Sequence, residues 1–349
     1  MPKVLLTDIN ILGIGSMLEY EFQHRTHRGH DTGAIFGTFK KLSRLLGGHR
    51  DKTPIILWDH RCKWRERILP QYKRHRWDTP EQQAFLKSYL AQAKLTRSLL
   101  AYLGFPQASC PNFEADDIAG LICRSLDPAW EITLATTDTD WYQALRSNVV
   151  WVSTRDGNVV AEADLGNAAV MKDGPFLSTD HYIQAKALAG DASDGIPGVK
   201  GVGLKTAARI IGEYGTIEAL WAKYDAGDPL QGVVIKRTAG PEYRDVYHRN
   251  LRLIDWRLGP RLHRNFRLEF EYPDPDAFKT LCAKWGLNEI SESWHGFSVP
   301  HQSGLSAIEG IRTILEAASS SRTDKKPIRA GLCADRGRLL IPQDMINVP

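Results

Sequence analysis

Short apolar runs alternate along the chain with longer segments in which apolar positions recur at helical spacing. The apolar runs predict buried strands at 4–7, 54–58, 131–136 and 149–153. The helical spacing predicts helices at 33–46, 86–103 and 114–126. Strands that alternate with helices in this way predict an α/β fold with a mostly parallel sheet flanked by helices, over about the first 150 residues.

The second half of the chain has a mainly helical pattern. It predicts helices at 179–189, 204–214, 216–224, 242–253 and 275–285, a strand at 266–270 and a glycine-rich loop at 225–240. From residue 299 the periodicity weakens, and a Ser-rich, charged segment follows. We therefore expect three parts: residues 1–178, residues 179–298 and a flexible tail at 299–349.

Three of the predicted strands run into acidic residues, and three more acids open the helix at 114–126. In chain order these residues are Asp8, Asp59, Glu114, Asp116, Asp117, Asp138 and Asp140. Because the carboxyl ends of parallel strands share one edge of the sheet, we expect these carboxylates to lie close together. Taken singly, each could be a helix cap or a turn former, but together they would repel unless cations neutralise them. Oxygen ligands without Cys or His favour Mg²⁺ or Mn²⁺, and a pair of such ions is the usual machinery of phosphodiester cleavage.

The stretch between the helices at 179–189 and 204–214 reads GDASDGIPGVKGVGL. It adds the carboxylates Asp191 and Asp194, and its glycines would let the backbone approach a phosphate at the N-terminus of the following helix. A helix before the loop argues against a P-loop, which follows a strand. For the glycines alone, an ordinary turn before a helix is the alternative.

Charge is unevenly distributed along a chain whose formal net charge is only +4. A basic stretch at 61–97 precedes an acidic stretch at 101–140, which suits a polyanionic substrate that is brought to a metal centre. Trp64 and Tyr72 interrupt the basic stretch and could stack on bases, although a solvated basic helix gives a similar pattern.

Cysteine usage and hydropathy indicate the compartment. The five cysteines form no C-x-x-C pair, so neither a disulfide framework nor a zinc site is indicated. We find no apolar run long enough to span a membrane and no signal-peptide pattern. We expect a cytoplasmic protein that makes no membrane contact.

With these motifs assembled, the chain resembles the flap endonuclease / 5′→3′ exonuclease family, in particular the stand-alone bacteriophage enzymes and the 5′-nuclease domain of bacterial DNA polymerase I. The matching segments occur in family order and cover roughly residues 1 to 290. They are VLLTDIN, TGAIFG, ILWD, KWR, LPQYKRHR, NFEADDIAG, ATTDTDW, GDASDGIPGVKGVGLKTA and FEYPDPDAFKTLCAKWGL. The resemblance implies a PIN-like catalytic domain at 1–178 with a basic helical arch around 60–100. It also implies a helix-three-turn-helix DNA-binding motif within 179–298.

The resemblance also assigns roles to individual residues. Asp8, Asp59, Glu114 and Asp116 would hold a first ion, Asp117 would lie between two ions, and Asp138, Asp140, Asp191 and Asp194 would serve the second. Lys73 and Arg76 would act in catalysis with Asp8 and Asp59. The implied DNA contacts are Tyr72, Lys63, Arg65, Gly198, Gly201, Gly203, Lys205 and Thr206. The implied ions are two Mg²⁺, replaceable by Mn²⁺, and K⁺ in the loop of the helix-three-turn-helix motif.

Two positions depart from the family pattern. Gly195 stands where the family commonly has asparagine, and we expect a looser turn there without loss of a ligand. The run NILGIG after Asp8 lacks the usual aromatic–basic pair, and nothing that we can name matches residues 300–349.

The expected function is that of a two-metal-ion, structure-selective 5′→3′ exonuclease or flap endonuclease in DNA replication or repair, of bacteriophage type and acting in the host cytoplasm. Its partners would be duplex DNA with a 5′ flap or 5′ end, together with a replicative polymerase or a single-strand-binding protein. The alternatives are an RNase H-type 5′ nuclease on RNA–DNA hybrids and a non-catalytic DNA-binding accessory protein.

Overall fold

A computed structural model describes residues 2–260, 266–294, 297, 299 and 301–320. Its centre is a seven-stranded sheet in the order β11-β5-β4-β1-β6-β7-β8. Five strands are parallel, namely β1 (Lys3–Asp8), β4 (Thr53–Trp58), β5 (Gln107–Ser109), β6 (Glu131–Thr136) and β7 (Val149–Ser153). The antiparallel strands β11 (Arg267–Glu269) and β8 (Val159–Val160) form the two edges. The mostly parallel α/β fold that the sequence predicts is therefore confirmed.

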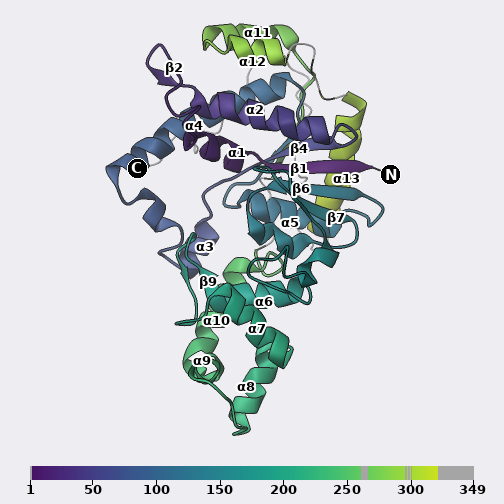
Figure 1. Cartoon of the computed structure of the whole chain (residues 1–349). Coiled ribbons are helices and arrows are strands. Elements are labelled where there is room, and N and C mark those ends of the chain that lie inside the picture. The colour runs from purple at the N-terminus through teal and green to yellow at the C-terminus, as the bar shows by residue number, and fades with distance from the viewer. Residues whose placement is uncertain (1, 261–265, 295–296, 298, 300, 321–349) are drawn as a thin grey trace.

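Helices cover both faces of the sheet (Figure 1). Alternation along β1 sends Leu5 into one core and its neighbours Val4 and Leu6 into the other. The core around Leu5 is closed by α1 (Ile9–Met17), α2 (Gly33–Gly48), α4 (Pro80–Tyr102), α11 (Pro275–Lys284) and α12 (Asn288–Ser293). The opposite core includes α5 (Ala115–Ser125) and α13 (His301–Ser320). Because apolar side chains are buried on both faces of the sheet, these strands have continuous apolar runs in the amino-acid sequence.

A group of helices forms the narrow lower end of the molecule in Figure 1. These helices are α6 (Thr179–Ala189), α7 (Leu204–Tyr214), α8 (Ile217–Asp225), α9 (Val233–Ala239) and α10 (Arg244–Ile254). The short strands β9 (Gly190–Asp191) and β10 (Ile196–Pro197) pair within the loop that joins α6 to α7. The prediction that helices at 179–189 and 204–214 flank this loop is therefore confirmed.

Shorter elements connect these layers. They are the hairpin strands β2 (Thr26–His27) and β3 (His30–Asp31), the helix α3 (Lys63–Ile68), and the 3₁₀ turns at Arg74–Trp77, Thr139–Ala144, Glu162–Gly166 and Pro241–Tyr243. The helix α4 begins at Pro80 because the Thr79 hydroxyl accepts from the Gln82 N–H and the Gln82 side chain accepts from the Thr79 N–H.

The structure corrects the sequence analysis at three segments. Residues 9–17 form α1, which the sequence analysis did not predict, and α9 lies within the predicted loop at 225–240. The predicted tail begins with the helix α13, whose Ala307, Ile308 and Ile311 are buried against the core. The rest of that tail, 321–349, lies outside the described residues.

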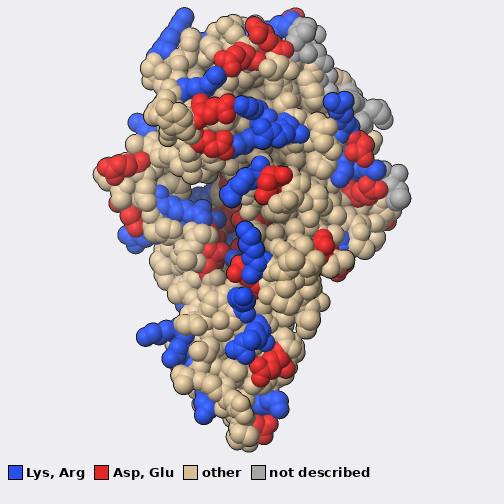
Figure 2. Space-filling view, viewed as in Figure 1, with Lys and Arg blue, Asp and Glu red and all other residues tan. Residues whose placement is uncertain are grey.

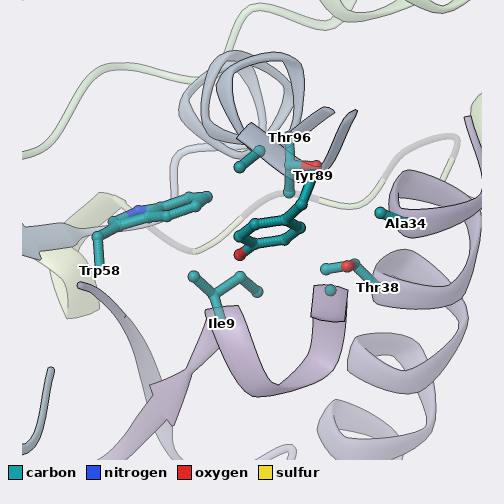
Figure 3. Close-up of a pocket in the computed structure, with 8 residues that line it drawn as sticks. Ile9, Ala34, Thr38, Trp58, Tyr89 and Thr96 are labelled. Atoms are coloured by element: carbon teal, nitrogen blue, oxygen red, sulfur yellow. The ribbon is translucent and has the colours of Figure 1, made fainter. Parts of the chain in front are cut away.

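A tyrosine from α4 holds this helix against α1. In Figure 3 the Tyr89 ring lies between Ile9 and Thr38, and its hydroxyl donates to Asn10 Oδ1 at 2.6 Å. A Cβ on Gly13 would lie 2.7 Å from the Tyr89 ring, so the glycine permits this close packing. The run NILGIG therefore has a packing role in this chain.

Helices α1 and α2 meet through a second glycine, and this contact yields a prediction about stability. A Cβ on Gly37 would lie 2.2 Å from Ser16 Oγ, whereas a Cβ on Gly47 in the same helix meets nothing within 4 Å. We expect Gly37→Ala to lower the free energy of unfolding by about 1–3 kcal/mol, and Gly47→Ala to leave it unchanged or raise it by up to about 1 kcal/mol. Urea unfolding measures both variants, and equal effects would contradict the packing.

Candidate active site

Carboxylates gather where the parallel strands end; Asp8 is buried, Asp116 and Asp138 are half-buried, and Asp59 is exposed. Asp8 closes β1, Asp59 and Asp138 follow β4 and β6, and Asp116 lies in the first turn of α5. In addition to burial, electrostatic repulsion from Asp59 and Asp138 raises the pKa of Asp8, and repulsion from Asp138 raises the pKa of Asp116. The structure thus brings together acids that are far apart in the sequence, as the strand topology predicts.

Neighbouring N–H groups orient each of these four carboxylates. Asp8 Oδ1 accepts from the backbone N–H groups of Asn10 and Ile11 and caps α1. The backbone N–H groups of Ala115 and Asp140 donate to Asp59 and Asp138 at 2.7 and 2.8 Å. The Trp141 indole donates to Asp116 Oδ1 at 2.7 Å. The sequence analysis did not single out Trp141, although it lies directly beside the predicted ligand Asp140.

The other acids of the cluster are already neutralised by basic side chains. Lys73 Nζ lies 2.6 Å from Glu114 Oε1, Arg76 Nη2 lies 2.7 Å from Asp194 Oδ1, and Arg65 pairs with Asp117. Lys186 Nζ bridges Asp140 at 2.6 Å and Asp191 at 2.7 Å. Within the described part of the chain, no Lys or Arg ion pair is formed by Asp8, Asp59, Asp116 or Asp138.

The four acids without a basic partner all have raised pKa values. Burial raises the pKa of Asp8 and Asp116 well above the ordinary range, and neighbouring carboxylates raise it further. Burial also raises the pKa of Asp59, and it raises the pKa of Asp138 to about 7, again with a contribution from a nearby acid. A divalent cation would relieve this repulsion, and oxygen donors suit a hard ion such as Mg²⁺. Among the described residues no three potential ligands already form a group that could hold a metal ion, so an ion would have to draw these side chains together.

These raised pKa values predict how the stability of the metal-free protein depends on pH. The pKa of Asp138 is about 7 in the folded chain and 3.8 ordinarily, so the folded state binds more protons between these values. Stability should therefore fall as pH rises through this window, by about 2 kcal/mol between pH 5 and pH 7. Glu114 and Asp191 have lowered pKa values and act in the opposite sense around and below their ordinary values of 4.5 and 3.8. The lowered pKa values of His49 and His181 oppose the trend just below their ordinary value of 6.5, whereas the raised pKa values of Asp8 and Asp116 reinforce it. Urea unfolding in EDTA at both pH values tests this expectation; a more stable protein at pH 7 would contradict it.

The structure corrects the roles expected for Arg65 and Asp117. Arg65 is only 3% exposed, and its guanidinium donates to both carboxylate oxygens of Asp117, to Glu114 and to the Leu253 carbonyl. Arg65 is therefore a buried counter-charge and does not reach a surface where DNA could bind. Asp117 also accepts from the Glu114 N–H, so both of its oxygens are engaged within the protein and its charge is already neutralised by Arg65.

Tyr72 also differs from its expected role as a stacking aromatic. The side chain is 6% exposed, and its hydroxyl donates to Glu114 at 2.7 Å and to Asp194 at 3.1 Å. Burial raises the pKa of this hydroxyl well above its ordinary value, so it remains a donor. Tyr72 thus links α5 to the loop at 191–194, and its ring has no face open to a base. Lys63, at the start of α3, is exposed.

Lys73 and Arg76 are held where the segment at 71–76 meets the loop at 191–194. The Lys73 N–H donates to the Asp194 carbonyl, and the Arg76 guanidinium also donates to the Ser193 carbonyl. Gly195 has φ +69, and a Cβ there would approach the Gln71 carbonyl oxygen to 3.0 Å. The glycine thus gives a close approach of two backbones instead of the looser turn that we expected.

The glycines of the α6–α7 loop have different environments. A Cβ on Gly198 would lie 2.0 Å from the Ala189 carbonyl oxygen, so this glycine is required for packing. Gly201 has φ +81, and a Cβ on Gly203, the N-cap of α7, would meet nothing within 4 Å. Lys205 is exposed in the first turn of α7, and Thr206 beside it is half-buried. The N-terminus of α7 is therefore open to an anion, whereas Gly198 allows the loop to pack closely on the end of α6.

Figure 2 shows acidic side chains recessed near the middle of one face, with Lys and Arg side chains beside them. Further basic side chains continue on the same face towards the narrow lower end. A recessed acidic group flanked by basic side chains can hold a cation and attract a polyanion at the same place.

The fold and this site define an α/β domain with an acidic strand edge, followed by a helix–loop–helix domain. Two family models match these parts: residues 13–173 match the N-terminal resolvase-like domain of 5′-3′ exonucleases, and residues 177–240 match their C-terminal SAM fold. The chain belongs to the flap endonuclease / 5′→3′ exonuclease family.

Individual relatives agree with this assignment. DNA polymerase I of Mycobacterium tuberculosis is 33% identical over 318 residues, which cover 85% of this chain and 33% of the relative. DNA polymerase I of Deinococcus radiodurans is 34% identical over 202 residues, which cover 57% of this chain and 20% of the relative. The chain thus matches a third or less of these polymerases.

Solved structures share the fold. The D15 protein of bacteriophage T5, co-crystallised with metal ions, has a TM-score of 0.59 at 21% identity, covering 83% of this chain and 99% of that protein. The catalytic core of Rad2 in complex with DNA has a TM-score of 0.51 at 17% identity, covering 85% of this chain and 91% of that protein.

The described residues contain no helix that is both long and apolar enough to cross a membrane.

Proposed function

We propose that the protein is a divalent-metal-dependent 5′ nuclease that hydrolyses DNA phosphodiester bonds at a 5′ flap or 5′ end. The observation that carries this proposal is the set of four neighbouring carboxylates without a basic ion-pair partner, Asp8, Asp59, Asp116 and Asp138, beside Lys73 and Arg76. Family membership and the T5 flap endonuclease structure, whose title names a complex with DNA and metal ions, support the proposal.

The four carboxylates would hold the ion, and we propose Mg²⁺, with Mn²⁺ as a substitute. A bound divalent ion lowers the pKa of its water and stabilises the negative charge that develops on the phosphate. Lys73 Nζ and the Arg76 guanidinium would contribute positive charge to the same phosphate. Both are now paired with acids, Glu114 and Asp194, so a phosphate would compete with these carboxylates for them.

The DNA duplex would lie against the N-terminus of α7. Open backbone N–H groups near Gly203 and the exposed Lys205 would bind duplex phosphates, with Thr206 and Gly201 beside them. The 5′ strand would pass the basic segment around 60–100, where Lys63 is exposed. We also propose that the α6–α7 loop binds K⁺. In this loop the Lys200 carbonyl already accepts from Arg237 of α9 at 2.7 Å.

This activity fits a role in DNA replication or repair in the cytoplasm, with a replicative polymerase or a single-strand-binding protein as the proposed protein partners. We propose that residues 1–178 form the catalytic domain, and that 179–298 bind the duplex and complete the nuclease fold.

A panel of 5′-labelled substrates tests the function. The panel comprises a DNA flap duplex, its bare single strand, and the same flap with an RNA 5′ strand, each with Mg²⁺ or EDTA. We expect Mg²⁺-dependent cutting near the flap junction, with the bare strand cut poorly. Preferred cutting of the RNA 5′ strand would identify an RNase H-type enzyme. Tight, salt-sensitive binding without cutting would identify an accessory protein.

A further inference from the structure

Lys186 lies in the position where the sequence predicts a second metal ion. It belongs to the buried side of α6, and only 8% of the residue is exposed. Its Nζ lies 2.6 Å from Asp140 Oδ1 and 2.7 Å from Asp191 Oδ2. Both carboxylates were predicted to serve the second ion, and both instead bind this ammonium group.

Both oxygens of Asp191 already have partners, and Oδ1 has three of them. Its Oδ1 accepts from the Ser193 N–H at 2.8 Å, the Ser193 hydroxyl at 2.6 Å and the Asp194 N–H at 3.2 Å. These bonds hold the loop at 191–194 that also contacts Lys73 and Arg76. An ion that took Asp191 as a ligand would have to displace the loop's bonds at Oδ1 or share Oδ2 with the Lys186 ammonium group.

The remaining acids offer a different place for an ion. Asp138 is two residues from Asp140, and its charge adds to burial in raising the pKa of Asp8 and of Asp116, two acids that lack a basic ion-pair partner. A divalent ion among Asp8, Asp116 and Asp138 would gain charge neutralisation there. An ion between Asp140 and Asp191 would instead meet an ammonium group at contact distance, which is strongly unfavourable in a partly buried site.

We propose that Lys186 is an internal cation that replaces a direct metal bridge between Asp140 and Asp191. The protein then holds one divalent ion tightly, and it takes up a second only when Lys186 is displaced. This inference rests on the proposed function, because it concerns the ions of the same site. Lys186 is a positioning residue: it fixes Asp140 and Asp191 and is not required to touch the substrate.

The inference is tested by measuring Mn²⁺ binding to the full chain without DNA. Calorimetry and the EPR signal of free Mn²⁺ each report the number of bound ions and their affinities. We expect one tight site in the wild type. In Lys186→Met the affinity of a second site should rise by about 10- to 100-fold, because the competing charge is gone. Lys186→Arg keeps the charge and should keep one tight site. Lys223→Met removes an exposed lysine of α8 and should bind Mn²⁺ as the wild type does.

The wild-type stoichiometry decides the inference even if Lys186→Met does not fold. Two ions of similar affinity in the wild type would overturn the role of Lys186. A second site that is weaker in Lys186→Met than in the wild type would overturn it as well. If the wild type binds no Mn²⁺ at all, the proposed metal-dependent function fails, and this inference fails with it.

Discussion

Asp138→Asn should abolish flap cleavage and, in the same molecule, stabilise the metal-free protein. The amide has nearly the shape of the carboxylate, and its oxygen can still accept from the Asp140 N–H, but it carries no charge to hold a cation. We expect the rate of cleavage to fall by about 10³-fold or more. At pH 8 the ionised Asp138 is destabilising because its pKa is raised to about 7. Its removal should therefore raise the free energy of unfolding by up to about 4 kcal/mol in EDTA.

Single-turnover cleavage and urea unfolding of the same preparations measure the two effects. Asp156→Asn is the matched control, because Asp156 is exposed and its Oδ1 accepts from the Asn158 N–H, a bond that the amide preserves. We expect this control to match the wild type in both assays. Wild-type cleavage by Asp138→Asn would remove Asp138 from the site, and a loss of stability would show that its charge is already compensated.

Arg65→Met should destabilise the protein by about 3–5 kcal/mol, as is typical when one partner of a buried ion pair is removed. The guanidinium binds Asp117 through two nitrogens at 2.8 and 2.9 Å and binds Glu114 at 2.9 Å. Without it, Asp117 is a buried carboxylate that no basic side chain neutralises. Glu114 retains Lys73, so the loss should fall mainly on Asp117.

Urea unfolding of the EDTA-treated protein measures this loss, and a second substitution locates it. Adding Asp117→Asn to Arg65→Met should recover part of the stability, because the two residues act as one unit. Arg61→Met, which breaks an exposed pair with Glu66, should cost no more than about 1 kcal/mol. If Arg65→Met unfolds like the wild type but binds duplex DNA more weakly, the DNA contact expected from the sequence is right and the structural role is wrong.

The sequence predicted the parts of this protein that depend on periodicity and topology. Apolar runs located β1, β4, β6 and β7, and the helices between β1, β4 and β6 account for the parallel order of these three strands. That Asp8, Asp59 and Asp138 meet is a consequence of this topology, because each follows a parallel strand at the same edge. Family membership is confirmed for the same reason: the motifs occur in family order.

Which charged side chains are buried was not visible in the sequence. The basic stretch at 61–97 was interpreted as a DNA-binding segment or a solvated basic helix, yet Cys62, Arg65 and Leu69 are all buried and recur at helical spacing in and beside α3. That spacing was the signal that could have placed Arg65 inside. Lys186 was missed similarly, although buried alanines flank it on α6. A cation on an apolar helix face must find an acidic partner, but the sequence does not say which one.

The central claim, that the acidic edge of the sheet is a metal-dependent nuclease centre, is tested most directly by returning Mg²⁺ to EDTA-treated wild-type protein. Cleavage of a 5′-labelled flap duplex and the Tm are followed over the same Mg²⁺ series, with Asp138→Asn alongside. Ion binding and catalysis should have one midpoint: as Mg²⁺ rises, cleavage appears and the Tm increases together, and Asp138→Asn shows neither. Cleavage that persists in EDTA, or that returns while the Tm stays unchanged, would contradict the claim.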